Sequence, residues 1–172
     1  MKPFILAGIT ALAAAPVFAQ DEMMGDAENG ETLFSRQCVA CHVVVDDEGE
    51  TIAGRNARTG PNLYAINSRP VGSDEDFRYS DYLPILGEDG SSWTEEWFVE
   101  YVQDPTGFLR AHLDDSSARS KMAFQVRHEE DAYDIWAFLT SVSPEVEDEG
   151  MADDGASDEE MTEGEDAAES DG

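Results

Sequence analysis

Apolar side chains recur with the period of an α-helix in the C-terminal half of the chain. Positions i, i+3, i+4 and i+7 of this pattern are occupied by Ala132, Ile135, Trp136 and Leu139. The spacing places all four side chains on one face, so it predicts an amphipathic helix over 129–141. Such a face needs a second element to cover it.

The covering element is predicted near the start of the chain. Asp26 can cap a helix that extends to about Gln37, with Leu33 and Phe34 on its inner face. Gly30 lies one turn before Phe34, although glycine inside a helix costs roughly 1 kcal/mol relative to alanine. We therefore expect the C-terminal helix to cross closely at Gly30.

Two further elements are predicted between these helices. The run Ser92-Trp93-Thr94-Glu95 has the pattern of a capping box, and the helix that it opens should end near Gln103, before Asp104-Pro105. A short helical turn with proline first is expected over 61–66. Strand patterns are weak and no internal repeat appears, so we predict an all-α fold with long loops.

The two ends of the chain differ from its middle. Residues 1–19 have the pattern of a cleaved signal peptide, with Lys2 before an apolar stretch and Val17-Phe18-Ala19 at the cleavage site, which predicts export to the periplasm. An uncleaved membrane anchor is the alternative. Residues 145–172 contain fourteen Asp or Glu and no Lys or Arg, so a disordered acidic tail is predicted. One folded domain, 20–144, remains.

This domain is itself acidic. Its 25 acidic and nine basic side chains give a formal net charge of −16. Nucleic acids and anionic lipid surfaces both require a basic surface, so neither is an expected partner. The acidity favours basic partners or solubility in a salty medium, and the sequence does not separate these two.

The chemistry is concentrated in Cys38-Val39-Ala40-Cys41-His42, a C-x-x-C-H run of the kind that attaches a c-type haem. The two thiols would bind the haem vinyl groups, and His42 would ligate the iron through a neutral imidazole nitrogen. A redox C-x-x-C would need a βαβ context, which is not visible. A zinc site would need more ligands, and only His112 and His128 could add imidazoles.

Six ordered motifs make residues 24–142 resemble the class I c-type cytochromes, specifically the bacterial cytochrome c2 type. They are the C-x-x-C-H run, Thr59-Gly60-Pro61-Asn62-Leu63-Tyr64, Phe77-Arg78-Tyr79-Ser80-Asp81, Trp93 with Tyr101, Ser120-Lys121-Met122-Ala123-Phe124, and Ile135-Trp136-Ala137-Phe138-Leu139. The resemblance implies a single-domain class I cytochrome c fold, with helices wrapped around one haem c held covalently through Cys38 and Cys41.

The resemblance also implies the two axial ligands of the iron. His42 would be the fifth ligand and Met122 the sixth, and this pair raises the reduction potential. The other methionines lie in the signal, next to the mature N-terminus or in the tail. His112 and His128 are the competing sixth ligands.

Further residues receive roles from the same resemblance. The Pro61 carbonyl would accept a hydrogen bond from His42. Tyr79 and Trp93 would bind a buried haem propionate, with Arg78 or Arg69 as a charge partner. Tyr101 would bind the methionine sulfur. Ordinary core packing is the alternative for each aromatic residue.

With both axial positions filled, the expected protein is an electron carrier and not an enzyme. The resemblance implies a soluble, monomeric, periplasmic carrier that takes electrons from cytochrome bc1 to a photosynthetic reaction centre or a terminal oxidase. The alternatives are a dedicated donor to one periplasmic redox enzyme, a sensor or enzyme with a displaceable sixth ligand, and a membrane-anchored carrier.

The charge pattern departs from that family. Many of its members surround the haem edge with lysines, whereas Lys121 is the single lysine after the signal. Either the partner surfaces are unusually basic, or an arginine patch surrounds the edge. The candidates for that patch are Arg55, Arg58, Arg110, Arg119 and Arg127. The acidic tail would either increase solubility or tune docking.

Overall fold

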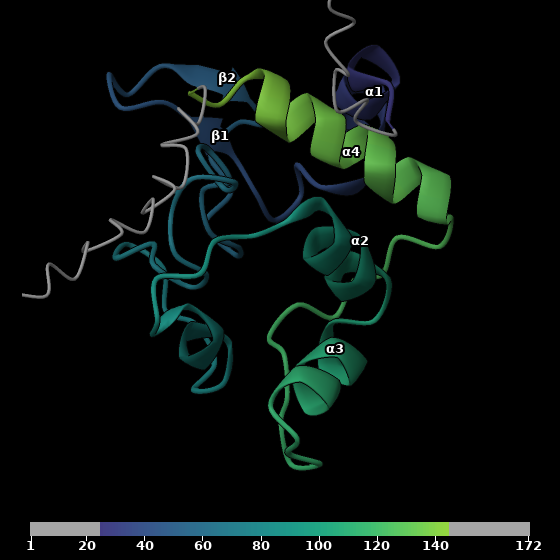
Figure 1. Ribbon diagram of the computed structural model, residues 1–172. Coiled ribbons are helices and arrows are strands. Elements are labelled where there is room, and N and C mark those ends of the chain that lie inside the picture. The colour runs from purple at the N-terminus through teal and green to yellow at the C-terminus, as the bar shows by residue number, and fades with distance from the viewer. Residues whose placement is uncertain (1–24, 145–172) are drawn as a thin grey trace, which may run out of the picture.

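The computed structural model describes residues 25–144 (Figure 1). The proposed signal peptide, 1–19, and the acidic tail, 145–172, lie outside the described residues. The elements in chain order are α1 (Ala27–Gln37), β1 (Val44–Val45), β2 (Thr51–Ala53), the 3-10 helix Leu83–Gly87, α2 (Glu95–Gln103), α3 (Pro105–His112) and α4 (Glu129–Ser141). The all-α prediction is confirmed, apart from one small antiparallel hairpin formed by β1 and β2.

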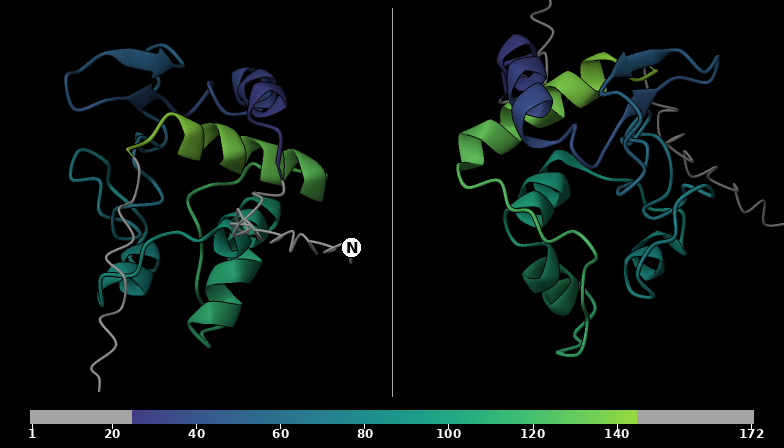
Figure 2. Two further views of the ribbon diagram at one scale, coloured as in Figure 1. Left: turned by 45° about the horizontal axis from the view of Figure 1, so that its top comes forward. Right: turned by 180° about the vertical axis from the view of Figure 1, so that it is seen from behind.

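Helices α1 and α4 cross closely, as Figures 1 and 2 both show. A Cβ atom on Gly30 would overlap with the backbone carbonyl of Asp134, which confirms the predicted reason for a glycine there. The Asp134 carboxylate also accepts a hydrogen bond from the backbone N–H of Asp26, at 2.7 Å. The rings of Phe34 on α1 and Phe138 on α4 also pack together, with their centroids 5.5 Å apart.

Helix α2 begins two residues later than the capping box predicts. Its cap is Thr94, whose hydroxyl accepts from the backbone N–H of Trp97 at 3.2 Å. Ser92 lies outside the helix because it forms an antiparallel bridge with Pro70. The predicted end at Gln103 is confirmed.

Helix α3 is an element that the sequence analysis missed. Asp104 closes α2 and also caps α3, where its carboxylate accepts from the backbone N–H of Gly107 at 3.0 Å. Pro105 fits because the first helical residue needs no N–H partner. The same dipeptide therefore ends one helix and begins the next. Phe108 and Leu109 then bury the inner face of α3.

The helical turn predicted over 61–66 is wrong. Asn62 instead forms a parallel bridge with Val43, and its side-chain amide bonds the backbone N–H and carbonyl of Val45 at 3.0 and 2.7 Å. These contacts hold Asn62 beside the hairpin in place of a helix. A turn follows, in which Ala65 adopts a positive φ of 54°.

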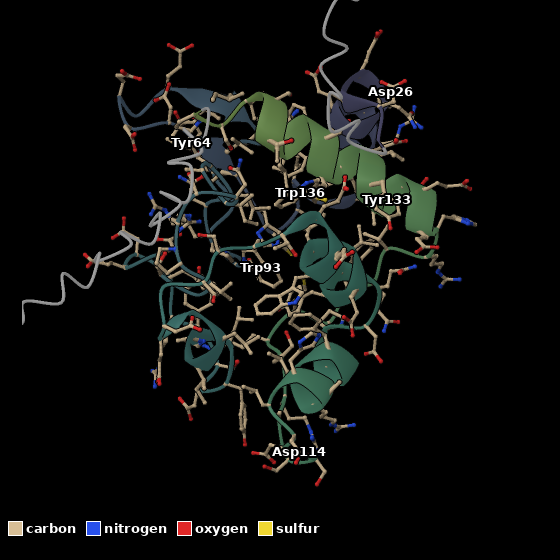
Figure 3. All side chains as sticks on the ribbon, viewed as in Figure 1. Asp26, Tyr64, Trp93, Asp114, Tyr133 and Trp136 are labelled. Carbon is tan, nitrogen blue, oxygen red and sulfur yellow. The ribbon has the colours of Figure 1, made fainter. Side chains whose placement is uncertain are left out.

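The core is made of large apolar side chains from all four α-helices. The largest fully buried ones include Phe34, Phe108, Leu109, Ile135 and Leu139. Figure 3 shows Trp93 in the interior and Trp136 on α4. Among residues 25–144, no helix is both long and apolar enough to cross a membrane.

Candidate cofactor site

A cavity of about 500 Å³ lies within this core and has the size of a small-molecule or cofactor site. All eight residues predicted to bind the haem line it: Cys38, Cys41, His42, Pro61, Tyr79, Trp93, Tyr101 and Met122. They come from segments up to 84 positions apart in the sequence, Cys38 to Met122. The fold therefore brings the whole predicted set to one place.

His42 is held at the cavity wall by its backbone and its ring. Its backbone N–H donates to the Cys38 carbonyl at 2.9 Å, and Nδ1 lies 3.0 Å from the Pro61 carbonyl oxygen. A carbonyl can only accept, so Nδ1 carries the proton. Burial lowers the pKa of His42, and the bond to Pro61 offsets only part of that effect. The imidazole is therefore neutral at neutral pH, which leaves Nε2 free to act as a metal ligand.

Gly60 contributes a role that the sequence analysis did not assign. A Cβ atom there would overlap with the ring of His42. The backbone N–H of Gly60 also donates to the Cys41 carbonyl at 2.8 Å. The quoted run Thr59-Gly60-Pro61 contained this residue, but its closeness to His42 depends on how two loops meet.

Cys38 and Cys41 are free thiols that lie half-buried on the cavity wall. Burial, with a smaller contribution from the charge of Cys41, raises the pKa of Cys38 to about 12. That thiol therefore remains protonated at neutral pH. Among residues 25–144, no three His, Cys, Asp or Glu side chains are grouped so as to hold a metal ion, which leaves the zinc alternative without support.

Met122 reaches the cavity from the loop between α3 and α4. Its backbone N–H donates to Ser120 Oγ at 3.0 Å, and the Tyr101 hydroxyl lies 2.8 Å from the same oxygen. Tyr101 was expected to bind the Met122 sulfur, whereas in the structure its hydroxyl is paired with Ser120. Ser120 was quoted as part of the family motif but given no role. It connects α2 to the loop that carries Met122.

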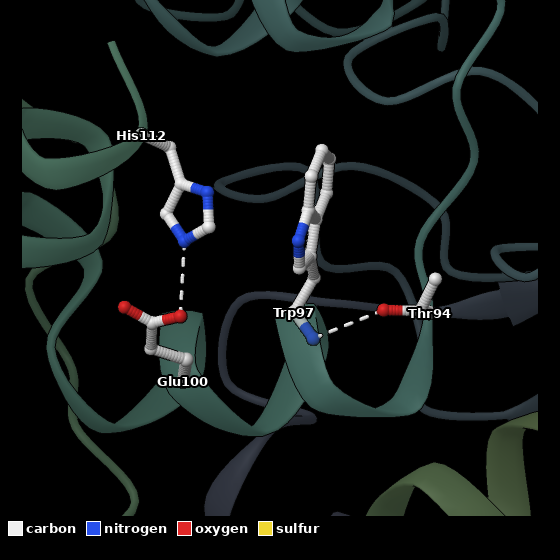
Figure 4. Close-up of polar contacts among 4 residues, drawn as sticks. All are labelled: Thr94, Trp97, Glu100 and His112. Atoms are coloured by element: carbon white, nitrogen blue, oxygen red, sulfur yellow. Dashed lines mark hydrogen bonds and ion pairs between the residues drawn. The ribbon is translucent and has the colours of Figure 1, made fainter. Parts of the chain in front are cut away.

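Neither competing histidine lines the cavity. His112 Nε2 lies 2.9 Å from Glu100 Oε2 of α2, as Figure 4 shows. Its ring packs on Phe108, with centroids 4.1 Å apart. His128 is exposed and precedes α4. Met122 is therefore the better placed sixth ligand.

The structure distinguishes the two arginines that the sequence analysis left open as charge partners. Arg69 lines the cavity, and Arg78 is exposed and does not. One guanidinium nitrogen of Arg69 bonds the Asn62 carbonyl, and its buried Nε has no hydrogen-bond partner. Burial raises the pKa of Tyr79, while the charge of Arg69 and a hydrogen bond to it act in the opposite direction. A half-buried guanidinium whose buried Nε is unpaired fits a site for an anionic group.

The charges around the cavity differ from those of the rest of the domain. None of the described Asp or Glu residues lines it, and its charged side chains are Arg36, Arg69 and Lys121. The five arginines of the predicted patch do not line it, although Arg58, Arg119 and Arg127 each follow or precede a lining residue directly in the sequence. Phe124 also lines the cavity and is 46% exposed, so the mouth is apolar and cationic.

Known proteins resemble the chain in both sequence and structure, although no family model matches it. Cytochrome c2 from Rhodovulum adriaticum is 56% identical over 121 residues, 70% of this chain and 95% of that protein. Cytochrome c2 from Cereibacter sphaeroides is 50% identical over 139 residues, 80% of this chain and 93% of that protein. The crystal structure of cytochrome c2 from Rhodobacter sphaeroides gives a TM-score of 0.67 at 48% identity, covering 71% of this chain and 99% of that one.

These similarities extend through the described domain, and they agree with the fold and with the residues gathered at the cavity. The chain belongs to the class I c-type cytochromes, in the cytochrome c2 family.

Proposed function

We propose that the chain is a periplasmic one-electron carrier, with haem c attached through Cys38 and Cys41 and ligated by His42 and Met122. Membership of the cytochrome c2 family supports an electron carrier and not an enzyme. The observation that carries the proposal is the convergence of all eight predicted residues on one cavity.

When bound, haem c supplies a one-electron iron couple. The residues of the chain would fix its position and environment. Pro61 keeps the His42 ring oriented and its Nδ1 protonated. Ser120 fixes the backbone of Met122. The buried Nε of Arg69 and the half-buried Tyr79 hydroxyl, together with the Trp93 indole, would offset the cost of burying a haem propionate.

The cavity mouth supports a docking role. Arg36 and Lys121 are exposed beside Phe124, so an acidic partner surface with an apolar centre fits this face. We infer membrane redox complexes as the partners, with cytochrome bc1 as donor and a reaction centre or a terminal oxidase as acceptor. The carrier would act as a monomer after removal of residues 1–19.

A visible spectrum with a redox titration of the purified mature protein tests this function. We expect a haem c spectrum, and in the oxidised form the weak far-red band of methionine–iron ligation. Reduced protein should refuse carbon monoxide at neutral pH. A colourless protein, or ready binding of carbon monoxide, would contradict a carrier with both axial positions filled. The mass of the mature chain separately tests cleavage after Ala19.

A further inference from the structure

A second cavity, of about 480 Å³, lies behind the loop that supports His42. It shares Gly60, Pro61 and Arg69 with the first cavity. Its outer wall includes Arg55 and Arg58, both exposed. In the part of the chain that the structure describes, the one ion pair joins His112 to Glu100, so neither arginine has a carboxylate partner there.

The polypeptide leaves the described domain beside this cavity. Ser143 Oγ accepts from the backbone N–H of Ala65 at 3.0 Å and donates to the Leu139 carbonyl at 2.6 Å. Ala65 and its neighbour Tyr64 line the second cavity, and Figure 3 shows Tyr64 near the hairpin. These bonds hold the end of the described domain at Ala65, on the wall of the cavity that Arg55 and Arg58 also line.

The segment that continues from this point has the opposite charge. Residues 145–172 contain fourteen carboxylates and no Lys or Arg. The composition predicts disorder for this segment, and a disordered chain of this length would have a root-mean-square reach of about 30 Å. Short tethers give effective concentrations in the millimolar range, so even a weak contact is populated.

Acidic side chains near the two arginines limit the strength of this contact. Both oxygens of Asp74 accept from backbone N–H groups, those of Asn62 and Asp76. Asp47 and Asp76 share the wall with Arg55 and Arg58, so the contact should be weak and sensitive to salt.

We propose that the acidic segment 145–172 docks in cis on the Arg55–Arg58 surface. Carboxylates held there adjoin the loop of Gly60 and Pro61, beside the cationic mouth of the first cavity. They would compete with an acidic redox partner at low ionic strength. The contact itself does not depend on the proposed function; only its effect on docking rests on that function.

The test uses the reduced holoprotein and the arginine side-chain Nε–Hε NMR signals. The full chain is compared with a chain of equal length in which the fourteen tail carboxylates become Asn or Gln. We expect the Arg55 and Arg58 signals to differ between the two chains, while those of Arg110, in the last turn of α3, and Arg119, in the loop that follows, coincide. In about 1 M salt, where the Debye length is about 3 Å, the difference should vanish.

A second arm adds the free peptide 145–172 to a chain that ends at Pro144. Arg55→Gln combined with Arg58→Gln should abolish the shifts, and the control Arg127→Gln should preserve them. Coincident Arg55 and Arg58 signals in the two full-length chains at low salt would overturn the proposal. Equal shifts at all arginines would also overturn it, because they would indicate a diffuse charge effect and not a contact at Arg55 and Arg58. The visible spectrum of the same samples shows separately whether the haem assignment holds.

Discussion

The two walls of the haem cavity are built in different ways. On the His42 side, the hydrogen bonds involve mainly backbone groups. The N–H groups of His42 and Gly60 donate to the carbonyls of Cys38 and Cys41, and the Pro61 carbonyl accepts from the His42 ring. On the Met122 side, side-chain groups have a larger share: Ser120 Oγ binds the Met122 N–H and the Tyr101 hydroxyl, while one backbone bond joins Val126 to Val102. The two partners of the Ser120 hydroxyl, Tyr101 and Met122, lie on separate segments of the chain.

The difference concerns how each ligand is secured. Backbone bonds survive most side-chain substitutions, and they close small loops near the C-x-x-C-H run. Side-chain bonds between distant segments are lost with a single substitution. We therefore infer that the Met122 side is the weaker of the two, and that ligand exchange, where it occurs, takes place there.

Met122→Ala should have the largest effect of the variants that test the difference between the two walls. Removing the sixth ligand should abolish the far-red band completely and allow carbon monoxide to bind to the reduced protein. His112→Ala is the matched control, because His112 does not line the cavity. Spectra of both variants check this result. Retention of the band in Met122→Ala would transfer the ligand role to another residue.

Gly60→Ala tests the His42 side at the position where it is most crowded. The new Cβ would overlap with the His42 ring, and we expect a loss of about 3 kcal/mol in the free energy of unfolding. Gly49→Ala is the control, because a Cβ there meets no atom within 4 Å. Its positive φ of 81° alone should cost about 1 kcal/mol. Denaturant titrations measure both values. Equal losses of unfolding free energy in the two variants would contradict the steric role of Gly60.

Ser120→Ala tests the Met122 side. Losing the acceptor for the Met122 N–H and the partner of Tyr101 should cost about 1–3 kcal/mol. Added imidazole should then displace the methionine at least about fivefold more readily, since 1.4 kcal/mol corresponds to a factor of ten. Ser120→Thr keeps the hydroxyl and should restore the parent affinity. Unchanged imidazole binding in Ser120→Ala would mean that Ser120 does not secure the ligand.

The same distinction, between local contacts and contacts of distant segments, explains which features could be predicted from the sequence. The C-x-x-C-H run and the helices α1 and α4 are local patterns, so their chemistry and their bounds follow from spacing alone. The roles of Pro61, Tyr79, Trp93 and Met122 required resemblance to a family. Nothing in the sequence pairs Tyr101 with Ser120, because that bond depends on where a loop packs.

Two other features escaped prediction for similar reasons. Asp104-Pro105 is a valid stop for one helix and an equally valid start for another, so local chemistry cannot choose between them. Arg69 and Arg78 are both near the motif that carries Tyr79. Which of them turns into the cavity is decided by the path of the backbone, and hence by tertiary structure.

The smallest effect is expected at the cavity mouth, where the two walls meet solvent. Arg36→Glu should lower the rate of association with an isolated cytochrome bc1 complex by roughly tenfold at low salt, because it reverses a charge in a region without carboxylates. Arg110→Glu changes the net charge equally, but neither Arg110 nor its neighbours in α3 line the cavity, so its rate should stay within about twofold of the parent. Stopped-flow traces at increasing ionic strength compare the two variants. If both slow equally, net charge governs docking and the position of Arg36 is irrelevant; if only Arg36→Glu slows, the partner approaches the face that both ligand walls share.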